Sequence, residues 1–168
     1  GNYNAAIGGD ALKSNTTGSG NFAVGCGAAF SNTTGGCNSA IGKNALAGNT
    51  TGSSNFAVGL GAASSNTTGS SNFAVGQSAM TGALSGSNNV GFGTYSLRSN
   101  WGGSDNFAVG YISLCSNTTG YYNNALGTTA MCSNTTGYQN NAIGKGTLKS
   151  NTTGYNNNAI GNNALIGN

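Results

Sequence analysis

A short apolar motif returns along this chain at a fixed interval of 17 residues. In almost every copy an Asn is followed two residues later by Ala, then by a large apolar residue, then by Gly. The large apolar position is occupied in ten successive copies by Ile7, Val24, Ile41, Val58, Val75, Phe92, Val109, Leu126, Ile143 and Ile160. A flexible linker has no reason to keep such a column in register, so the period indicates a repeat protein.

The repeat length restricts the fold class. A unit of 17 residues is too short for the paired helices of helical solenoids. β-Branched residues beside Gly and Asn favour a short strand near residues 4–8, then a turn and a second short extended segment. We therefore predict an all-β parallel β-solenoid, or β-roll, of ten coils stacked about 4.8 Å apart. A single helical turn at the Ala-Leu segment near residues 11–12 is an alternative that the sequence leaves open.

Two kinds of column are complete in all ten repeats and predict how the coils are held together. Stacked Asn side chains can pass amide hydrogen bonds from coil to coil. The predicted structural ladder consists of Asn4, Asn21, Asn38, Asn55, Asn72, Asn89, Asn106, Asn123, Asn140 and Asn157. Two Gly columns, which begin at Gly1 and Gly8, indicate corners with positive φ or close backbone approach. Columns that begin at Ala11 and Leu12 predict a narrow core.

The strand itself raises a question of burial. Adjacent strand residues such as Ala6 and Ile7 point to opposite faces, yet both columns are restricted to apolar residues or Gly. If one column lines the interior, a partner chain is the simplest cover for the other, which predicts side-by-side self-association. The alternative is that Gly8 bends the strand so that both residues turn inward. Phe22 and three later Phe residues lie two positions before the Ile/Val column and should share its face, and the last three repeats carry Asn there instead.

Charge and composition exclude several functions. Charged residues make up only 4% of the chain, and its five basic and two acidic side chains are scattered. This distribution argues against a nucleic-acid partner. The chain has no His, and Asp10 and Asp105 are too far apart in the repeat array to act as paired carboxylates, so we expect no enzyme activity, no cofactor and no metal site. No apolar run approaches the roughly 20 residues that a membrane helix requires.

The four cysteines are interpreted through the stacking. Cys115 and Cys132 occupy the same position in consecutive coils, which would place their Cα atoms about 5 Å apart, within reach of a disulfide. Cys26 and Cys37 lie in consecutive coils but at different positions, so their pairing is a weaker candidate. Free thiols are the alternative in both cases.

A second Asn column begins sequons for N-glycosylation. The candidate acceptors are Asn15, Asn32, Asn49, Asn66, Asn117, Asn134 and Asn151. Glycans one coil apart would be crowded, so a structural Asn-Thr turn is the preferred interpretation and a glycan-coated filament the alternative. The Thr column that begins at Thr16 is also typical of ice-binding solenoids, although Leu84 and Trp101 interrupt it.

Four stretches resemble the head repeats of YadA-type trimeric autotransporter adhesins: "NFAVGCGAA" (21–29), "NSAIGKNAL" (38–46), "NNAIGKGTL" (140–148) and "NNAIGNNAL" (157–165). Similar arrays occur in phage tail-fibre-like and bacterial surface proteins. The resemblance implies a left-handed parallel β-roll, association of three chains, and attachment at a cell or virion surface. The additional Ser-Asn-Thr-Thr segment makes each repeat longer than the usual adhesin head repeat.

These observations lead to one expectation about function. We expect residues 1–168 to be a single repeat array, part of a longer extracellular fibre with structural and adhesive roles on a cell surface or virion. The expected partners are further copies of the chain, as a homotrimer or filament, and an unidentified surface receptor or glycan. The alternatives are the glycan-coated structural filament and the ice-binding solenoid.

Overall fold

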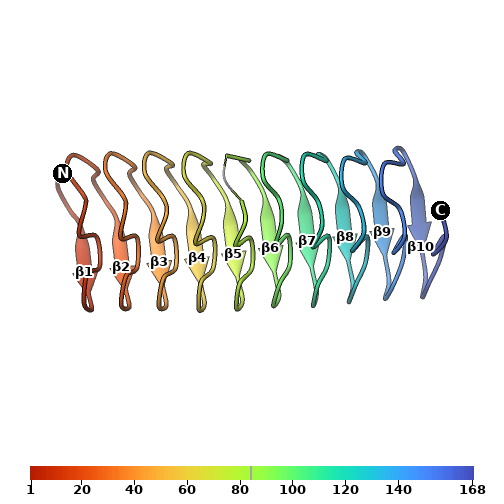
Figure 1. Cartoon of the computed structure of the whole chain (residues 1–168), viewed down its shortest axis with the longest axis horizontal. Helices are drawn as coiled ribbons and strands as arrows, with labels where there is room; N and C mark the ends of the chain where they lie inside the picture. The colour runs from red at the N-terminus through yellow and green to blue at the C-terminus, as the bar shows by residue number, and fades with distance from the viewer. Residues whose placement is uncertain (84) are drawn as a thin grey trace.

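The computed structural model describes residues 1–83 and 85–168. Leu84, one of the two residues that interrupt the Thr column, lies outside the described residues. Each repeat contributes one three-residue strand to a rod whose termini lie at opposite ends (Figure 1). The strands are β1 (Ala5–Ile7), β2 (Phe22–Val24), β3 (Ser39–Ile41), β4 (Phe56–Val58), β5 (Phe73–Val75), β6 (Val90–Phe92), β7 (Phe107–Val109), β8 (Asn124–Leu126), β9 (Asn141–Ile143) and β10 (Asn158–Ile160).

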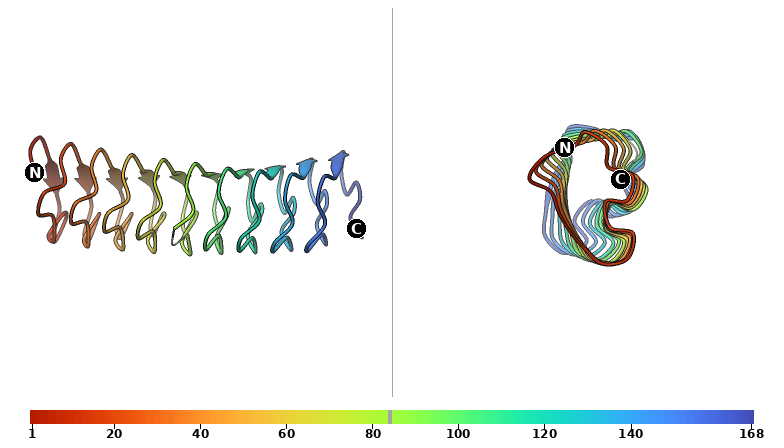
Figure 2. Two further views of the ribbon diagram at one scale, coloured as in Figure 1. Left: turned by 90° about the horizontal axis from the view of Figure 1, so that it is seen from above. Right: turned by 90° about the vertical axis from the view of Figure 1, so that its left-hand side faces the viewer.

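The strands form one parallel sheet in chain order, β1 to β10. Pairing joins equivalent residues of consecutive repeats, as Ala40 with Ala57 and Ile41 with Val58. Viewed along the rod, successive coils superimpose with a small progressive rotation (Figure 2). The predicted all-β parallel solenoid of 17-residue repeats is therefore confirmed, while its left-handed turn and its side-by-side association stay predictions.

The segment after each strand differs from the expectation. Residues 9–14 of the first coil are turns, neither a second strand nor a helical turn, and no helix occurs in residues 1–83 or 85–168. The turns still hydrogen-bond between coils, because the N–H of Leu46 donates to the carbonyl of Ala62 at 2.9 Å. Backbone groups in this segment are thus satisfied by the stack, as strand groups are in the sheet.

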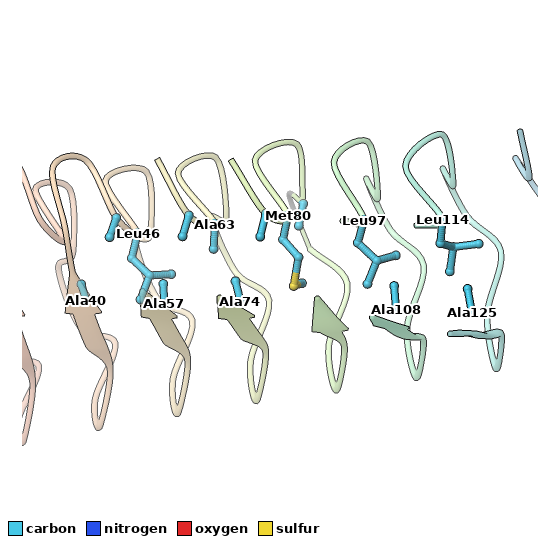
Figure 3. Close-up of a cluster of buried hydrophobic side chains, with 14 of the residues drawn as sticks. Ala40, Leu46, Ala57, Ala63, Ala74, Met80, Leu97, Ala108, Leu114 and Ala125 are labelled. Atoms are coloured by element: carbon cyan, nitrogen blue, oxygen red, sulfur yellow. The ribbon is translucent and has the colours of Figure 1, made fainter. Parts of the chain in front are cut away.

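The core is narrow and contains two facing columns (Figure 3). Strand alanines such as Ala57 are completely buried and lie opposite the column that contains Leu46, Met80 and Leu97. Leu46 has a φ of 52°, and every residue of its column has a positive φ although none is Gly. A left-handed backbone is costly for such side chains, and the sequence carried no signal for it. The conformation turns the chain sharply and directs these side chains into the rod.

Both complete Gly columns are explained by contact between coils. Gly42 has a φ of 128°, and a Cβ atom there would lie 2.6 Å from the carbonyl oxygen of Gly59. Gly35 belongs to the other column, and a Cβ there would collide with the carbonyl oxygen of Gly52. The expectation of positive φ or close backbone approach is confirmed. The column that contains Gly42 shows both features, and the column that contains Gly35 shows close approach.

Candidate interaction surfaces

Asn side chains form a buried lattice with the Gly column that begins at Gly1. The Asn55 Nδ2 atom donates to the carbonyl of Gly69 at 2.9 Å, and the Asn66 Nδ2 atom donates to the same oxygen at 2.9 Å. The Asn55 Oδ1 atom accepts the backbone N–H of Asn72 at 3.0 Å. From Gly18 to Gly154 the carbonyls of this column each accept from amides of two different columns, except Gly86, which accepts from Asn72 alone. This shared acceptor accounts for the recurrence of both residue types.

The sequon asparagines belong to this lattice. Asn32, Asn49, Asn66, Asn117, Asn134 and Asn151 are buried, and Asn15 is partly buried. The Asn49 Nδ2 atom donates to Asn32 Oδ1 at 2.7 Å and to the Gly52 carbonyl at 2.9 Å. An N-glycan is attached through this same nitrogen. A sugar at Asn49 would replace one of the two N–H groups that make these hydrogen bonds, and it would need space at a side chain that is completely buried.

One coil interrupts this second ladder. Ala83 stands where an Asn would continue it, and the Oδ1 atom of Asn66 is buried without a hydrogen-bond partner. On the other side of the gap the Asn100 Nδ2 atom donates to the Gly103 carbonyl at 2.7 Å. The gap leaves an acceptor unpaired in the interior, which costs about 1–3 kcal/mol.

We expect Ala83→Asn to stabilise the rod by about 1–2 kcal/mol, because the new amide would donate to Asn66 and accept from Asn100. Chemical denaturation of both proteins measures the difference. Ala79→Asn is the control, since it places the same amide in the apolar core and should destabilise. A loss of stability in Ala83→Asn would show that the coil cannot accommodate the missing rung.

All four cysteines are free thiols in the structure. Cys115 is buried and Cys132 partly buried, and the Cys115 Sγ atom lies 3.4 Å from the carbonyl oxygen of Cys132. Burial raises the pKa of the Cys115 thiol, with a smaller contribution in the same direction from Cys132. The thiolate is thereby disfavoured and the thiol less reactive. Cys26 and Cys37 are exposed, and both disulfide pairings stay predictions.

The outer face of the sheet is apolar over most of the rod. The Ala6 and Ile7 columns do separate to opposite faces: from Ala23 onward the Ala column is buried, and the Ile/Val column is half-buried or exposed. The alternative that Gly8 turns both columns inward is therefore wrong. Phe residues share the outer face, and Phe56 and Phe73 stack with ring centroids 4.9 Å apart. The exposed large apolar residues of this face are Ile7, Phe22, Phe56, Phe73, Phe92, Phe107, Leu126 and Ile160.

The last three coils change this face. Asn124, Asn141 and Asn158 replace the Phe residues and hydrogen-bond in series, with Nδ2 to Oδ1 distances of 3.0 and 2.9 Å. Beside the strands, Tyr121, Tyr138 and Tyr155 stack with centroids 4.9 and 5.0 Å apart. Because the ring faces cover one another, this Tyr ladder presents mainly ring edges and hydroxyls outward.

The Thr column that begins at Thr16 is also bound into the stack. The hydroxyl of Thr33 donates to the carbonyl of Thr50 at 3.0 Å, and the hydroxyl of Thr50 donates to that of Thr67 at 3.0 Å. These hydroxyl groups already donate within the protein, so their hydrogens are not available to bond to the water molecules of an ice surface. Trp101 occupies the same column and is exposed.

Comparison with protein-family models, with curated protein sequences and with solved structures found no match to this chain. In the described part of the chain, no helix has the length and apolar character needed to cross a membrane. The described residues also contain no group of three or more His, Cys, Asp or Glu side chains arranged to hold a metal ion.

Proposed function

We propose that this chain is a segment of a repetitive structural and adhesive fibre on a cell surface or virion, whose rods associate side by side as a homotrimer or filament. The observation that carries the proposal is the apolar outer face of the sheet. It runs along the rod over β2 to β7 and places a Phe or Val beside an Ile, Val or Phe at nearly every strand.

Burial of this face supplies the driving force for association. Full burial of one Phe or Ile side chain stabilises by about 1.5–3 kcal/mol relative to exposure. Phe22 and Phe107 are each about two-fifths exposed (41% and 43%) and Phe92 is half exposed (50%), so the same gain is repeated in part from coil to coil. Monomeric soluble proteins rarely expose a large continuous apolar patch, so a stripe of this kind indicates an interaction surface.

The side-chain contacts favour this function over the two alternatives. A glycan-coated filament needs accessible sequon amides, but the amide of Asn49 is buried and doubly hydrogen-bonded. An ice-binding surface needs a regular array of free hydroxyls, but the hydroxyl of Thr33 donates to the backbone of the next coil. Both groups stabilise the rod itself, in keeping with a structural role.

We expect Ile41→Asp to abolish self-association while leaving the coil folded, because the side chain lies half-buried on the outer face. Sedimentation velocity across a range of concentrations measures association, and circular dichroism measures the fold. Ser54→Asp is the matched control: it adds the same charge at an exposed position where Asp105 is found three coils further along, and it should still associate. A wild-type chain that stays monomeric at every concentration would contradict the proposal.

A further inference from the structure

A groove of about 730 Å³ runs along the side of the rod formed by the turns that follow the strands. Its lining comes from equivalent positions of the first five coils, so it follows the rod axis. Four coil-to-coil steps of about 4.8 Å give it a length of roughly 19 Å. The volume lies within the range of about 300–1,000 Å³ that is usual for ligand sites.

The groove exists because two neighbouring columns are small in the same coils. Gly61 and Ser78 belong to one column, and Ala47 and Ser64 to the other. In the sixth coil these columns carry Tyr95 and Arg98, whose guanidinium lies 5.7 Å from the ring centroid. Large side chains therefore follow directly beyond the last groove residues.

The other end is closed by an aromatic residue and an ion pair. Phe30 lines the groove and is about one-third exposed (37%), and Lys13 lies 5.6 Å from its ring centroid. Asp10 also lines the groove and pairs with Lys13 at 3.1 Å. The remaining described residues of the lining are uncharged. The groove consequently offers no net charge to attract an anionic or cationic polymer.

Polar side chains in the groove are available to a ligand. The amide of Asn44 and the hydroxyls of Ser64 and Ser78 make no hydrogen bond within the described part of the chain. They lie on three consecutive coils and so repeat along the groove at the spacing of the stack. Amides and hydroxyls both donate and accept, which suits the hydroxyl groups of a sugar.

The backbone of the groove does not suit a peptide strand. The N–H groups of Asn44, Gly61 and Ser78 each donate to a carbonyl of the preceding coil at 2.9 Å. A peptide that binds by strand addition requires a free sheet edge, which this wall lacks. An amphipathic helix requires a broad apolar surface, whereas the groove floor is made of Gly, Ala and Ser.

We propose that this groove binds a short, uncharged oligosaccharide of a surface glycan, extended along the rod axis. Its hydroxyls bond to Asn44, Ser64 and Ser78, and the ring of Phe30 packs against an apolar sugar face. This inference rests on the proposed adhesive function and names its ligand class, but the groove residues are distinct from the outer sheet face that is proposed to associate.

The test uses the whole chain and a panel of defined tetrasaccharides. Cellotetraose, maltotetraose and chitotetraose are the uncharged probes, and a sulfated heparin tetrasaccharide is the charged one. We expect at least one uncharged probe to bind with a Kd below about 1 mM by calorimetry. Ser64→Arg should weaken that binding at least tenfold, because it places in the groove the residue that Arg98 provides at the same position of a later coil.

Gln77→Arg is the matched control, since it adds the same side chain at an exposed position outside the groove lining. It should bind the probe as the unmodified chain does, and circular dichroism should show both variants folded. The inference is overturned if no uncharged probe binds, if Ser64→Arg binds unchanged, or if the sulfated probe binds more tightly. Ile41→Asp should bind the sugar normally, so failure of self-association and failure of sugar binding are separate results.

Discussion

Gly42→Ala should destabilise the rod by about 3–5 kcal/mol, a large part of the total stability of an ordinary domain. Gly42 adopts a φ of 128°, which L side chains rarely adopt. A Cβ atom would also lie 2.6 Å from the carbonyl oxygen and 2.8 Å from the carbonyl carbon of Gly59. Both atoms belong to backbone, so relief requires the two coils to separate and their shared hydrogen bonds to lengthen. Urea unfolding followed by circular dichroism measures the loss.

Gly61→Ala separates the two causes. Gly61 also has a positive φ, of 64°, but its nearest atom to an added Cβ is the Ser78 hydroxyl oxygen at 3.9 Å. We expect a cost of only about 1–2 kcal/mol, the penalty for a left-handed backbone alone. Equal losses in the two variants would mean that contact between coils contributes little at Gly42.

Asn55→Ala should cost about 2–3 kcal/mol, because it removes a buried amide whose partners cannot reach water. The Asn72 N–H loses its acceptor, and the Gly69 carbonyl and the Asn38 Oδ1 atom each lose one of their donors. The orphaned N–H accounts for most of the effect, since the other two atoms keep a second partner. Thermal unfolding should show the loss as a lower midpoint.

Asn141→Ala is the control for this ladder. Asn141 also hydrogen-bonds to its neighbours in the stack, but it lies on the outer face and is only partly buried. Water can replace its partners there, so we expect a loss below about 1 kcal/mol. A similar loss at both positions would show that burial does not distinguish the inner ladder from the outer one.

The recurrence of Asn55 and Gly42 was sufficient to predict what these residues do. In a stack of similar coils, a residue that returns at every repeat contacts its own equivalent in the next coil. An Asn that hydrogen-bonds to the equivalent Asn must therefore recur in every repeat. A Gly whose backbone lies too close to the next coil for a Cβ atom must recur for the same reason. The fold class followed from the same argument. The sequons were harder to interpret, because the sequence allowed the Asn49 column to be a glycan acceptor or a structural Asn-Thr turn. The buried ladder that this column forms was visible only in the structure.

The sequence by itself determined the period, the parallel stacking and the three complete columns, one of Asn and two of Gly, because these properties depend only on one coil meeting the next. It did not determine which side of the strand faces inward, since Ala57 and Val58 are both apolar. The inward side of the strand was decided by how the coil closes. The left-handed backbone at Leu46 and its equivalents directs large side chains into the interior, which leaves space on the strand side for Ala only. The groove was likewise decided by the closed coil, because two columns three residues apart line it together only after the turn has formed.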